Sequence, residues 1–468
     1  MTTNSTLASS TRKPGIYVGY DTTLASRNLP ANPQRVLVMG QRISAGTIAA
    51  LVATPVFSDK AAATYFGSGS AAHLMCRAAI NANPNVDLTC IGVDDAGGGT
   101  QGTQTVTFTG PATTSGSATL NIGMKTITIA ISATDTAITI AGAMNTAVGL
   151  VLDLPVTGAA PAAVLTLTAK NKGTIGNGIS VTCTVTAAGV TATVAAGVTG
   201  ATDPDIATAL TAIFPVRYHL IANQFSDSTN LGKLRTHIDL VSGKIEQRGA
   251  RAYTGLTGAL AASITIATGT PHERLIYPWS RGNTALACEV GAAYTAYRAS
   301  IDDPAMPIDD DVLPGIPVPP SQANWPSRTE QESALHNALT PLYVGSDNQV
   351  RICRAVTSYM TDASGNPDDT LLDDNPIPIL DYVRDVIRAI PRPKKCTQKR
   401  ADGYCDLILT QLRKLEKAEI LMDIDIYKAR LQVIANPDNR PAGWFQVTIP
   451  APYVPGLHVL DETIELYL

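Results

Sequence analysis

The sequence predicts a multidomain protein of mixed α/β and α+β class: an α/β core interrupted by an inserted all-β domain and followed by a C-terminal α+β domain. Its 468 residues exceed the size of one compact domain. Runs with strand and helix periodicity alternate on both sides of residues 96–200. Within that segment Phe108 is the only aromatic residue. The segment also holds only five charged residues, namely Lys125, Asp135, Asp153, Lys170 and Lys172.

Both ends of the chain are predicted to be arms, at residues 1–33 and 456–468. The first arm is polar until a short β-prone run after a Pro-Gly turn, formed by Ile16, Tyr17 and Val18. The second ends in DETIELYL, where polar residues alternate with Ile464, Leu466 and Leu468, as in a half-exposed strand. A lone strand at a chain end has unpaired backbone groups on both sides. Each arm is therefore expected to need a sheet edge in its own chain or in a neighbour.

The α/β core is predicted to have two parts, residues 34–95 and 201–320. The first part opens with QRVLVMG, a continuous apolar run ended by glycine, which is typical of a strand buried on both faces. An Ala-rich helix at 71–82 and a strand at 86–93 complete this unit. The second part repeats the alternation, with strands at 218–222, 250–253 and 275–277 and helices at 203–213, 230–247 and 283–300.

The segment between these parts, residues 96–200, is rich in Thr, Ala, Gly and Val. Apolar and polar residues alternate at 105–109, 126–131, 137–140, 164–169 and 180–185, and turn signals such as Asn177-Gly178 separate these runs. We interpret the segment as a small β-sandwich or barrel inserted into the core.

The remaining third, residues 321–455, is predicted to be the C-terminal α+β domain, reached through a loop rich in Pro and Asp at 301–320. Helices are predicted at 329–339 and 381–390, and a strand at 444–449. The longest helix is predicted near 406–435, with one apolar face formed by Ile408, Leu412, Leu415, Met422 and Ile426.

No motif that carries chemistry is present. A phosphate-binding loop, a nucleophile elbow and a zinc-protease helix are all missing from the sequence. The six histidines are isolated, which favours structural or surface roles, and they are His73, His219, His237, His272, His336 and His458. The paired aspartates at 302–303, 309–311, 368–369 and 373–374 lack EF-hand spacing, which favours solvated loop charge. The sequence therefore predicts no catalytic residue, no cofactor and no metal, and hence no enzyme.

Composition excludes further classes of protein. The seven cysteines are scattered and odd in number, which argues against a disulfide framework or a zinc ribbon. A net charge of −4 gives no overall attraction to nucleic acid or to an anionic membrane. The chain has no run of 18 apolar residues and opens without an apolar leader, so neither membrane insertion nor secretion is predicted.

One stretch, residues 392–417, is strongly basic, with eight cationic residues and three acidic ones. The cations are Arg392, Lys394, Lys395, Lys399, Arg400, Arg413, Lys414 and Lys417. A solvated loop and helix face would explain it, and so would an electrostatic docking surface for an acidic partner. Nucleic acid is the weaker candidate, because Tyr404 is the only aromatic available to stack on bases.

Three segments together resemble the tail sheath proteins of Mu-like contractile phage tails. The first is KPGIYVGYDTTLASRNLPANPQRVLVMGQR, from Lys13 to Arg42. The second is PHERLIYPW, from Pro271 to Trp279, and the third is the C-terminal PAGWFQVTIPAPYVPGLHVLDETIELYL. Their order and the chain length also fit. The resemblance covers most of the chain and is weakest over residues 96–200, where sheath proteins carry variable insertions.

The resemblance implies a structural subunit that forms hexameric discs around a tail tube. Terminal arms from neighbours would complete a sheet in the C-terminal domain, with Ile16, Tyr17, Val18, Ile464, Leu466 and Leu468 as donated strand residues. On a signal from the baseplate the sheath would contract and drive the tube through the host envelope for genome ejection. The implied partners are further copies of the chain, the tail tube protein, and the baseplate and tail terminator proteins. The implied location is the virion tail, assembled in the host cytoplasm, and the eight basic residues become candidates for facing the tube.

Two classes of alternative remain open. The same type of subunit would serve an R-type bacteriocin or another contractile injection particle. A different virion structural protein is the second, although tube proteins are much shorter and mostly a single barrel. A type VI secretion sheath, normally divided between two chains, and an enzyme fit the sequence less well.

Overall fold

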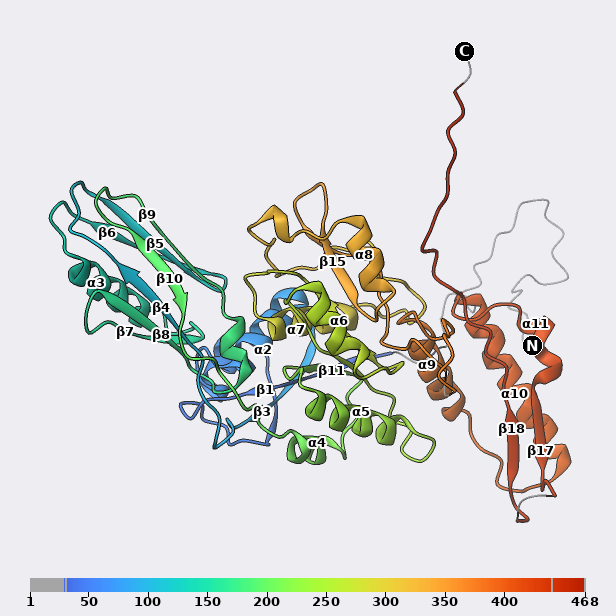
Figure 1. Ribbon diagram of the computed structural model, residues 1–468. Coiled ribbons are helices and arrows are strands. Elements are labelled where there is room, and N and C mark those ends of the chain that lie inside the picture. Colours follow the sequence, from blue (N-terminus) through green and yellow to red (C-terminus); the bar gives the residue numbers. More distant parts are fainter. Residues whose placement is uncertain (1–28, 30–31, 363, 439–440, 467–468) are drawn as a thin grey trace, which may run out of the picture. The chain divides into compact units, whose positions relative to one another are not determined.

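The computed structural model describes residues 29, 32–362, 364–438 and 441–466. The chain forms two compact units (Figure 1). The larger unit holds residues 33–381 together with the tail from Tyr453, and the smaller one holds residues 382–452. The division at Asp381 lies inside the segment predicted as the C-terminal domain. The described part of the chain has no helix that is both long and apolar enough to cross a membrane.

A six-stranded sheet in the order β13-β12-β11-β1-β3-β2 forms the centre of the larger unit (Figure 1). Its strands are β1 (Arg35–Gln41), β2 (Ala53–Pro55), β3 (Asp87–Val93), β11 (Leu220–Asn223), β12 (Arg251–Tyr253) and β13 (Leu275–Ile276). Neighbouring strands are parallel, except that β2 runs antiparallel to β3. The central strand β1 is buried over six consecutive residues, which confirms the strand predicted from QRVLVMG.

Helices cover both faces of this sheet. The helices of the larger unit's α/β part are α1 (Asp59–Phe66), α2 (Ala71–Ala82), α4 (Ala207–Ile213), α5 (Ser228–Ser242), α6 (Leu260–Thr268) and α7 (Ala287–Ala299). Val36 and Val38 of β1 share one apolar core with α2 and α7, whereas Leu37 and Met39 share another with α4 and α5. Alternate residues of one strand thus face two helical layers, as expected for a parallel sheet joined by crossover helices.

The predicted strand at 275–277 continues into a second sheet. Its three strands, in the order β14-β15-β16, are β14 (Pro278–Trp279), β15 (Thr340–Val344) and β16 (Val350–Ile352), and helices η2 (Gln322–Asn324) and α8 (Arg328–Leu335) precede β15. The segment PHERLIYPW therefore crosses from the central sheet to this smaller one. Trp279 is fully buried at the crossing, and its indole N–H donates to the Gly258 carbonyl at 2.9 Å.

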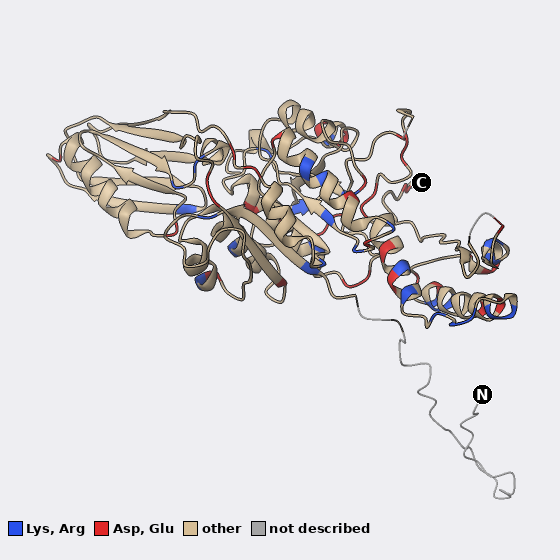
Figure 2. Cartoon of the chain, turned by 90° about the horizontal axis from the view of Figure 1, so that it is seen from below, with Lys and Arg blue, Asp and Glu red and all other residues tan. Residues whose placement is uncertain are grey.

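The insertion contains two antiparallel sheets and a helix, so the all-β prediction is wrong in one respect. One sheet has the order β10-β4-β8-β7 and the other β6-β5-β9. The strands are β4 (Thr103–Phe108), β5 (Gly116–Ile122), β6 (Lys125–Ile131), β7 (Val156–Ala159), β8 (Val164–Ala169), β9 (Val181–Val185) and β10 (Ala192–Ala196), with the short helix η1 (Thr174–Gly178) before β9. Figure 2 shows how few charged residues this part carries.

The helix in the insertion, α3 (Ala137–Leu150), replaces a predicted strand at 137–140. The Thr136 hydroxyl accepts from the Thr139 amide and caps the helix, and Ile140, Met144 and Val148 are buried at helical spacing. The alternation of Ile and Thr at the start suggested a strand. The apolar stripe further along the helix, packed on the sheet, decides its structure.

A polar cluster fastens the insertion to the core. Asn171 is buried; its side chain accepts from the Ala71 amide at 3.0 Å and donates to the Arg42 carbonyl at 3.0 Å. The Asp95 carboxylate accepts from Gln41, from Asn171 and from the Lys172 amide. Because these groups come from both the core and the insertion, the two parts are held together by buried and partly buried hydrogen bonds as well as by chain connectivity.

The smaller unit is built on one long helix and a hairpin. After α9 (Pro376–Arg388), which begins in the larger unit, its elements are α10 (Gln398–Lys417), α11 (Ile424–Tyr427), η3 (Lys428–Arg430), β17 (Gln432–Ala435) and β18 (Phe445–Thr448). The predicted helix at 406–435 is wrong at both ends. The Thr397 hydroxyl caps α10 eight residues earlier, and left-handed backbone at Glu419 and Asp423 ends the helical stretch. Met422 and Ile426 are consequently exposed instead of lying on the buried face.

Candidate functional site

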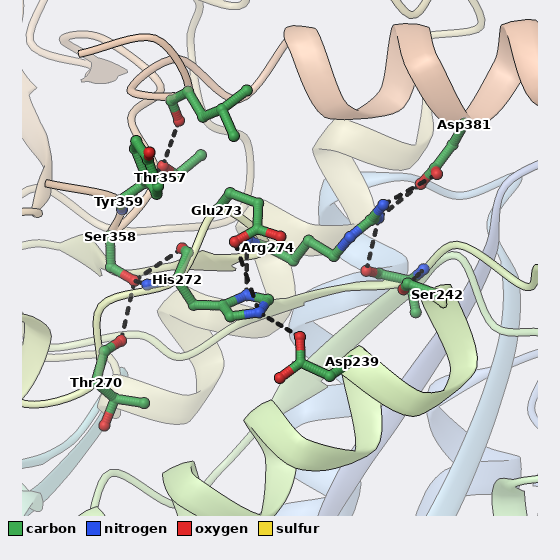
Figure 3. A network of polar contacts seen from close by, with 12 residues as sticks. Asp239, Ser242, Thr270, His272, Glu273, Arg274, Thr357, Ser358, Tyr359 and Asp381 are labelled. Carbon is green, nitrogen blue, oxygen red and sulfur yellow. Dashed lines mark hydrogen bonds and ion pairs between the residues drawn. The ribbon is translucent and has the colours of Figure 1, made fainter. Parts of the chain in front are cut away.

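The polar network around His272 is the arrangement that most resembles a catalytic site (Figure 3). The imidazole is buried, with its Nε2 2.8 Å from the Asp239 carboxylate and 3.7 Å from that of Glu273. Its Nδ1 accepts from the Arg274 amide at 3.0 Å, which leaves Nε2 as the nitrogen that donates to Asp239. Nδ1 is therefore not available to take up a proton from a substrate or a nucleophile.

Ser358 lies close to this histidine but does not complete a triad. The His272 backbone amide donates to the Ser358 hydroxyl at 2.9 Å, and that hydroxyl is within donor distance of the Thr270 and His272 carbonyls. A nucleophilic serine would need its hydroxyl on the imidazole. The network instead joins the start of PHERLIYPW to the segment around Ser358. Arg274 extends it with two hydrogen bonds to Asp381, at 2.7 and 3.1 Å.

Several histidines are buried structural residues, as the sequence favoured, although they have polar or charged neighbours that their isolation in the sequence does not reveal. The His73 Nε2 lies 2.8 Å from Asp59, yet burial lowers the pKa of His73 and outweighs the opposing effect of that carboxylate. Burial, with Arg248 nearby, lowers the pKa of His237 to about 4. These two side chains are therefore neutral core groups at neutral pH. Sequence spacing gave no signal for their partners, because these come from separate elements or from distant turns.

The aspartate pair 373–374 is not a solvated loop charge, contrary to the prediction. Asp374 is 1% exposed and accepts from Arg251 at 2.7 Å and from Arg298 at 3.1 Å. Burial alone would lower the pKa of Arg251, but the Asp374 carboxylate more than offsets that effect and raises it. The three groups come from β12, α7 and the turn before α9, so they form a buried ionic junction with a structural role.

The described residues contain no group of three or more His, Cys, Asp and Glu side chains arranged to hold a metal ion. All seven cysteines are free thiols. The polar clusters of the larger unit are thus occupied by contacts within the fold.

Exposed apolar side chains gather in the described part of the C-terminal arm instead. Ile464 and Leu466 are 95% and 85% exposed, and residues 459–466 form no strand with any described part of the chain. The predicted donor residues Ile16, Tyr17, Val18 and Leu468 lie outside the described residues.

The hairpin of the smaller unit offers edges that fit such a strand. β17 and β18 pair with each other and with no other strand among the described residues, so both outer edges of the pair are open. A groove of about 680 Å³ lies beside β18. Phe445, Val447 and Tyr404 supply its apolar lining, and its basic lining is formed by Arg392, Lys394 and Lys395.

The structure divides the predicted basic stretch into two sets. The first set, Arg392, Lys394 and Lys395, lines the groove. In the second, Lys399, Arg413 and Lys417 project from the side of α10 opposite its buried residues, where Arg413 pairs with Asp425 at 2.9 Å. Arg400 and Lys414 flank that side.

The chain is similar to several known proteins along most of its length. The phage tail sheath protein central domain matches residues 199–358. A Mu-like prophage FluMu tail sheath protein from Haemophilus influenzae is 28% identical over 431 residues, which cover 89% of this chain and 87% of the relative.

Two solved structures share the fold. The sheath tail protein of Desulfitobacterium hafniense aligns with a TM-score of 0.50 at 13% identity, covering 93% of this chain and 99% of that one. A chain of the anti-feeding prophage baseplate aligns with a TM-score of 0.52 at 10% identity, covering 98% and 100%. The central-domain match and the Mu-like relative together show that the chain resembles the phage tail sheath proteins of the Mu-like kind.

Proposed function

We propose that this chain is the subunit of a contractile tail sheath, which polymerises as hexameric discs around a tail tube and contracts to drive that tube through the host envelope. The observation that carries the proposal is that one chain has two complementary features. It has open strand edges on β17 and β18, and it has an exposed C-terminal arm in which apolar and polar residues alternate. A two-stranded sheet is only marginally stable by itself, and added strands would stabilise it. Exchange of arms between subunits supplies those strands and joins neighbours through backbone hydrogen bonds.

The groove beside β18 has the apolar and basic lining that would suit the C-terminal arm of a second copy. A strand laid along the open edge of β18 places alternate side chains toward the groove. With Ile464 and Leu466 on that side, Glu462 also faces the groove and its basic lining, whereas Glu465 faces away. Apolar burial would then provide affinity, and the carboxylate near Lys394 and Lys395 would favour one register.

Contraction in this proposal needs no nucleotide. The sheath assembles in an extended lattice, and many weak contacts between subunits favour a contracted one once the baseplate releases it. Exchanged strands keep the subunits connected while the compact units move as rigid bodies. The same device would serve a phage tail or a related injection particle. Similarity to a prophage tail sheath protein favours the phage tail.

The truncation of residues 461–468 tests this function directly. Full-length protein, concentrated or supplied with tube, is expected to form hollow cylinders in negative-stain electron microscopy. The truncated protein is expected to remain dispersed, because β18 then lacks its added strand. Cylinders from both proteins would contradict strand donation by this arm. Dispersed subunits from both, even with tube present, would contradict the sheath function itself.

The outward side of α10 is our candidate for contact with the tube. Replacing Lys399, Arg413 and Lys417 with glutamate is expected to reduce tube-templated assembly at least tenfold, because attraction to an acidic tube surface becomes repulsion. Co-sedimentation of sheath with tube at 50 and 500 mM salt measures the effect. The control replaces Lys60 and Lys244, two exposed lysines far from this helix in the sequence, with glutamate. Equal co-sedimentation of both variants would contradict the assignment.

A further inference from the structure

The charged residues of the insertion lie at its two ends. Four of the five lie where the insertion meets the core, namely Lys125, Asp153, Lys170 and Lys172. Asp153, for example, pairs with Lys125 at 2.7 Å and with Arg77 of α2 at 2.8 Å. The fifth, Asp135, lies in the turn between β6 and α3, at the end away from the core. Apart from Lys125 at the start of β6, the strands of the insertion and α3 carry no charge (Figure 2).

The outward side of the sheet β6-β5-β9 consists of small polar residues and one alanine. We call it the threonine face, and its residues are Ser117, Thr119, Asn121, Thr126, Thr128, Ala130, Thr182 and Thr184. Side-chain hydrogen bonds join the strands across it. The Thr119 and Thr128 hydroxyls are 3.1 Å apart, Thr126 donates to Asn121 at 2.8 Å, and Asn121 donates to Thr182 at 3.1 Å. Because these polar groups already have partners within the face, covering the face costs less than covering unpaired groups.

The outward side of the other sheet, β10-β4-β8-β7, holds only threonine, alanine and one valine. We call it the opposite face, and its residues are Thr103, Thr105, Thr107, Thr157, Ala159, Val164, Thr166, Thr168, Thr193 and Ala195. Inward residues of the two sheets, such as Leu120 of β5 and Leu167 of β8, belong to one buried core. The two uncharged faces therefore lie on opposite sides of the insertion.

Helix α3, which packs beside β6, adds an uncharged exposed side. Ile138 and Leu150 are 61% and 79% exposed. A helix with apolar residues all around it is normally buried on all sides. A Cβ added at Gly142 would have open space around it among the described residues, so the packing of the subunit does not require a glycine that destabilises the helix interior. These are features of a helix that another chain approaches closely.

The absence of charge affects how copies of the chain meet. A soluble surface carries about 25–35% charged residues, and a surface without charge tends to associate. Seven-residue strands are about 24 Å long and a layer of three strands and a helix is about 20 Å wide, so the threonine face with α3 offers roughly 500 Å². A stable complex buries about 800 Å² per partner. One such contact therefore gives weak attraction between free subunits and needs neighbours that are already side by side.

We propose that the threonine face of one subunit packs against the opposite face of the insertion in a neighbouring subunit. The inference rests on the proposed function, because it takes the neighbours to be held side by side in one polymer. Two different faces on opposite sides of one module allow head-to-tail contacts, which are the contacts that build rings and helices. The polymer raises the effective concentration of each insertion beside the next, so a weak contact is sufficient. A second copy is the partner that fits, because two uncharged faces meet without repulsion or unpaired charge.

The variant Thr128→Lys with Thr184→Lys places two charges on the threonine face. Both side chains are exposed in the subunit, so the variant should unfold at the wild-type temperature. The matched control, Ala133→Lys with Ala162→Lys, places two charges in exposed turns outside both faces. Lysine reduces the net negative charge of the chain in both variants, which by itself favours association. A loss of attraction in one variant alone must therefore come from the position of its charges.

Static light scattering of dispersed, full-length subunits measures the attraction as the second virial coefficient. At about 150 mM salt, long-range charge effects are largely screened. We expect a negative coefficient for wild type and for the control. The variant with lysines on the threonine face should have a positive coefficient, because the lysines would have to be desolvated against an uncharged face. Equal coefficients for this variant and the control would overturn the inference.

Charges on the opposite face test the pairing of the two faces. Thr107→Glu with Thr157→Glu, at two exposed positions, should also make the coefficient positive. A chain that carries these two changes together with Thr128→Lys and Thr184→Lys should regain a negative coefficient, because the lysines of one copy meet the glutamates of the next. Failure of this fourfold variant to regain attraction would overturn the pairing.

Cylinder assembly gives a second readout. The critical concentration for cylinders, measured by sedimentation, should rise about tenfold for Thr128→Lys with Thr184→Lys and stay unchanged for the control. Light scattering needs no cylinders, so the two proposals can fail separately. Loss of attraction confined to the face variants, with no cylinders from any chain, would reject the sheath function and keep the contact between insertions. Wild-type cylinders with equal virial coefficients for face variant and control would do the reverse.

Discussion

Replacing Asp374 with alanine is expected to lower the free energy of unfolding of the larger unit by about 3–5 kcal/mol. The substitution leaves the guanidinium groups of Arg251 and Arg298 buried without their shared carboxylate. It also removes the acceptor near the Tyr253 hydroxyl, 3.5 Å away. Because the three charged groups belong to β12, α7 and the turn before α9, the loss should loosen the packing of these elements together.

Guanidinium chloride unfolding followed by tryptophan fluorescence measures this loss. A Trp444→Phe background removes the one tryptophan of the smaller unit and leaves Trp279 and Trp325 as reporters of the larger one. Asp374→Asn keeps an acceptor and should cost less than alanine. Asp347→Ala, which breaks an exposed pair with Arg351, should have little effect. A change below about 1 kcal/mol for Asp374→Ala would show that the junction does not stabilise the fold.

The double substitution Ile464→Asp and Leu466→Asp is expected to abolish cylinder formation while leaving the isolated subunit folded. Both side chains are exposed in the subunit, so the change should cost no stability there. In the proposed lattice they face the groove lined by Phe445 and Val447. Aspartate at these two positions loses the apolar burial against Phe445 and Val447 and must desolvate a carboxylate there, and the cost recurs at every subunit.

Electron microscopy and sedimentation velocity report this assembly. The matched control is Glu465→Gln, which changes a residue on the opposite side of the same strand and should assemble as wild type does. Unimpaired cylinders from the double variant would contradict apolar docking of the arm. Equal failure of the Glu465→Gln control would show that the alternation of the arm does not determine its docking face.

Local sequence patterns correctly predicted those helices and strands whose structure depends mainly on residues adjacent in the chain. Residues 71–82 form helix α2 as predicted, since Ser70 caps it and Asn83-Pro84 ends it. The strands β1 and β3 follow from apolar runs of strand length. Alternation at 105–109, 126–131 and 164–169 predicted β4, β6 and β8 within one or two residues.

Elsewhere, packing in the folded chain decided the secondary structure against the local sequence pattern. The first residues of α3 alternate as a strand would, but the sheets of the insertion bury Ile140, Met144 and Val148 along one helical side. Residues 418–435, which follow α10, contain no Gly or Pro, so no local signal predicted that the helix would end at Lys417. Burial of Ile420 and Leu421 in the turn that follows accounts for the change of direction.

By itself, the sequence determined the mixed class, the alternating core, the charge-poor insertion and the alternating C-terminal arm, because each depends on periodicity or composition along a short stretch. Only the tertiary structure decided which distant polar groups meet. Asp374 lies 123 positions from Arg251 and 76 from Arg298, and His458 lies 149 positions from its partner Asp309. The physical reason is that a charged side chain is placed by the burial of the elements that carry it, and no spacing along the chain records that burial.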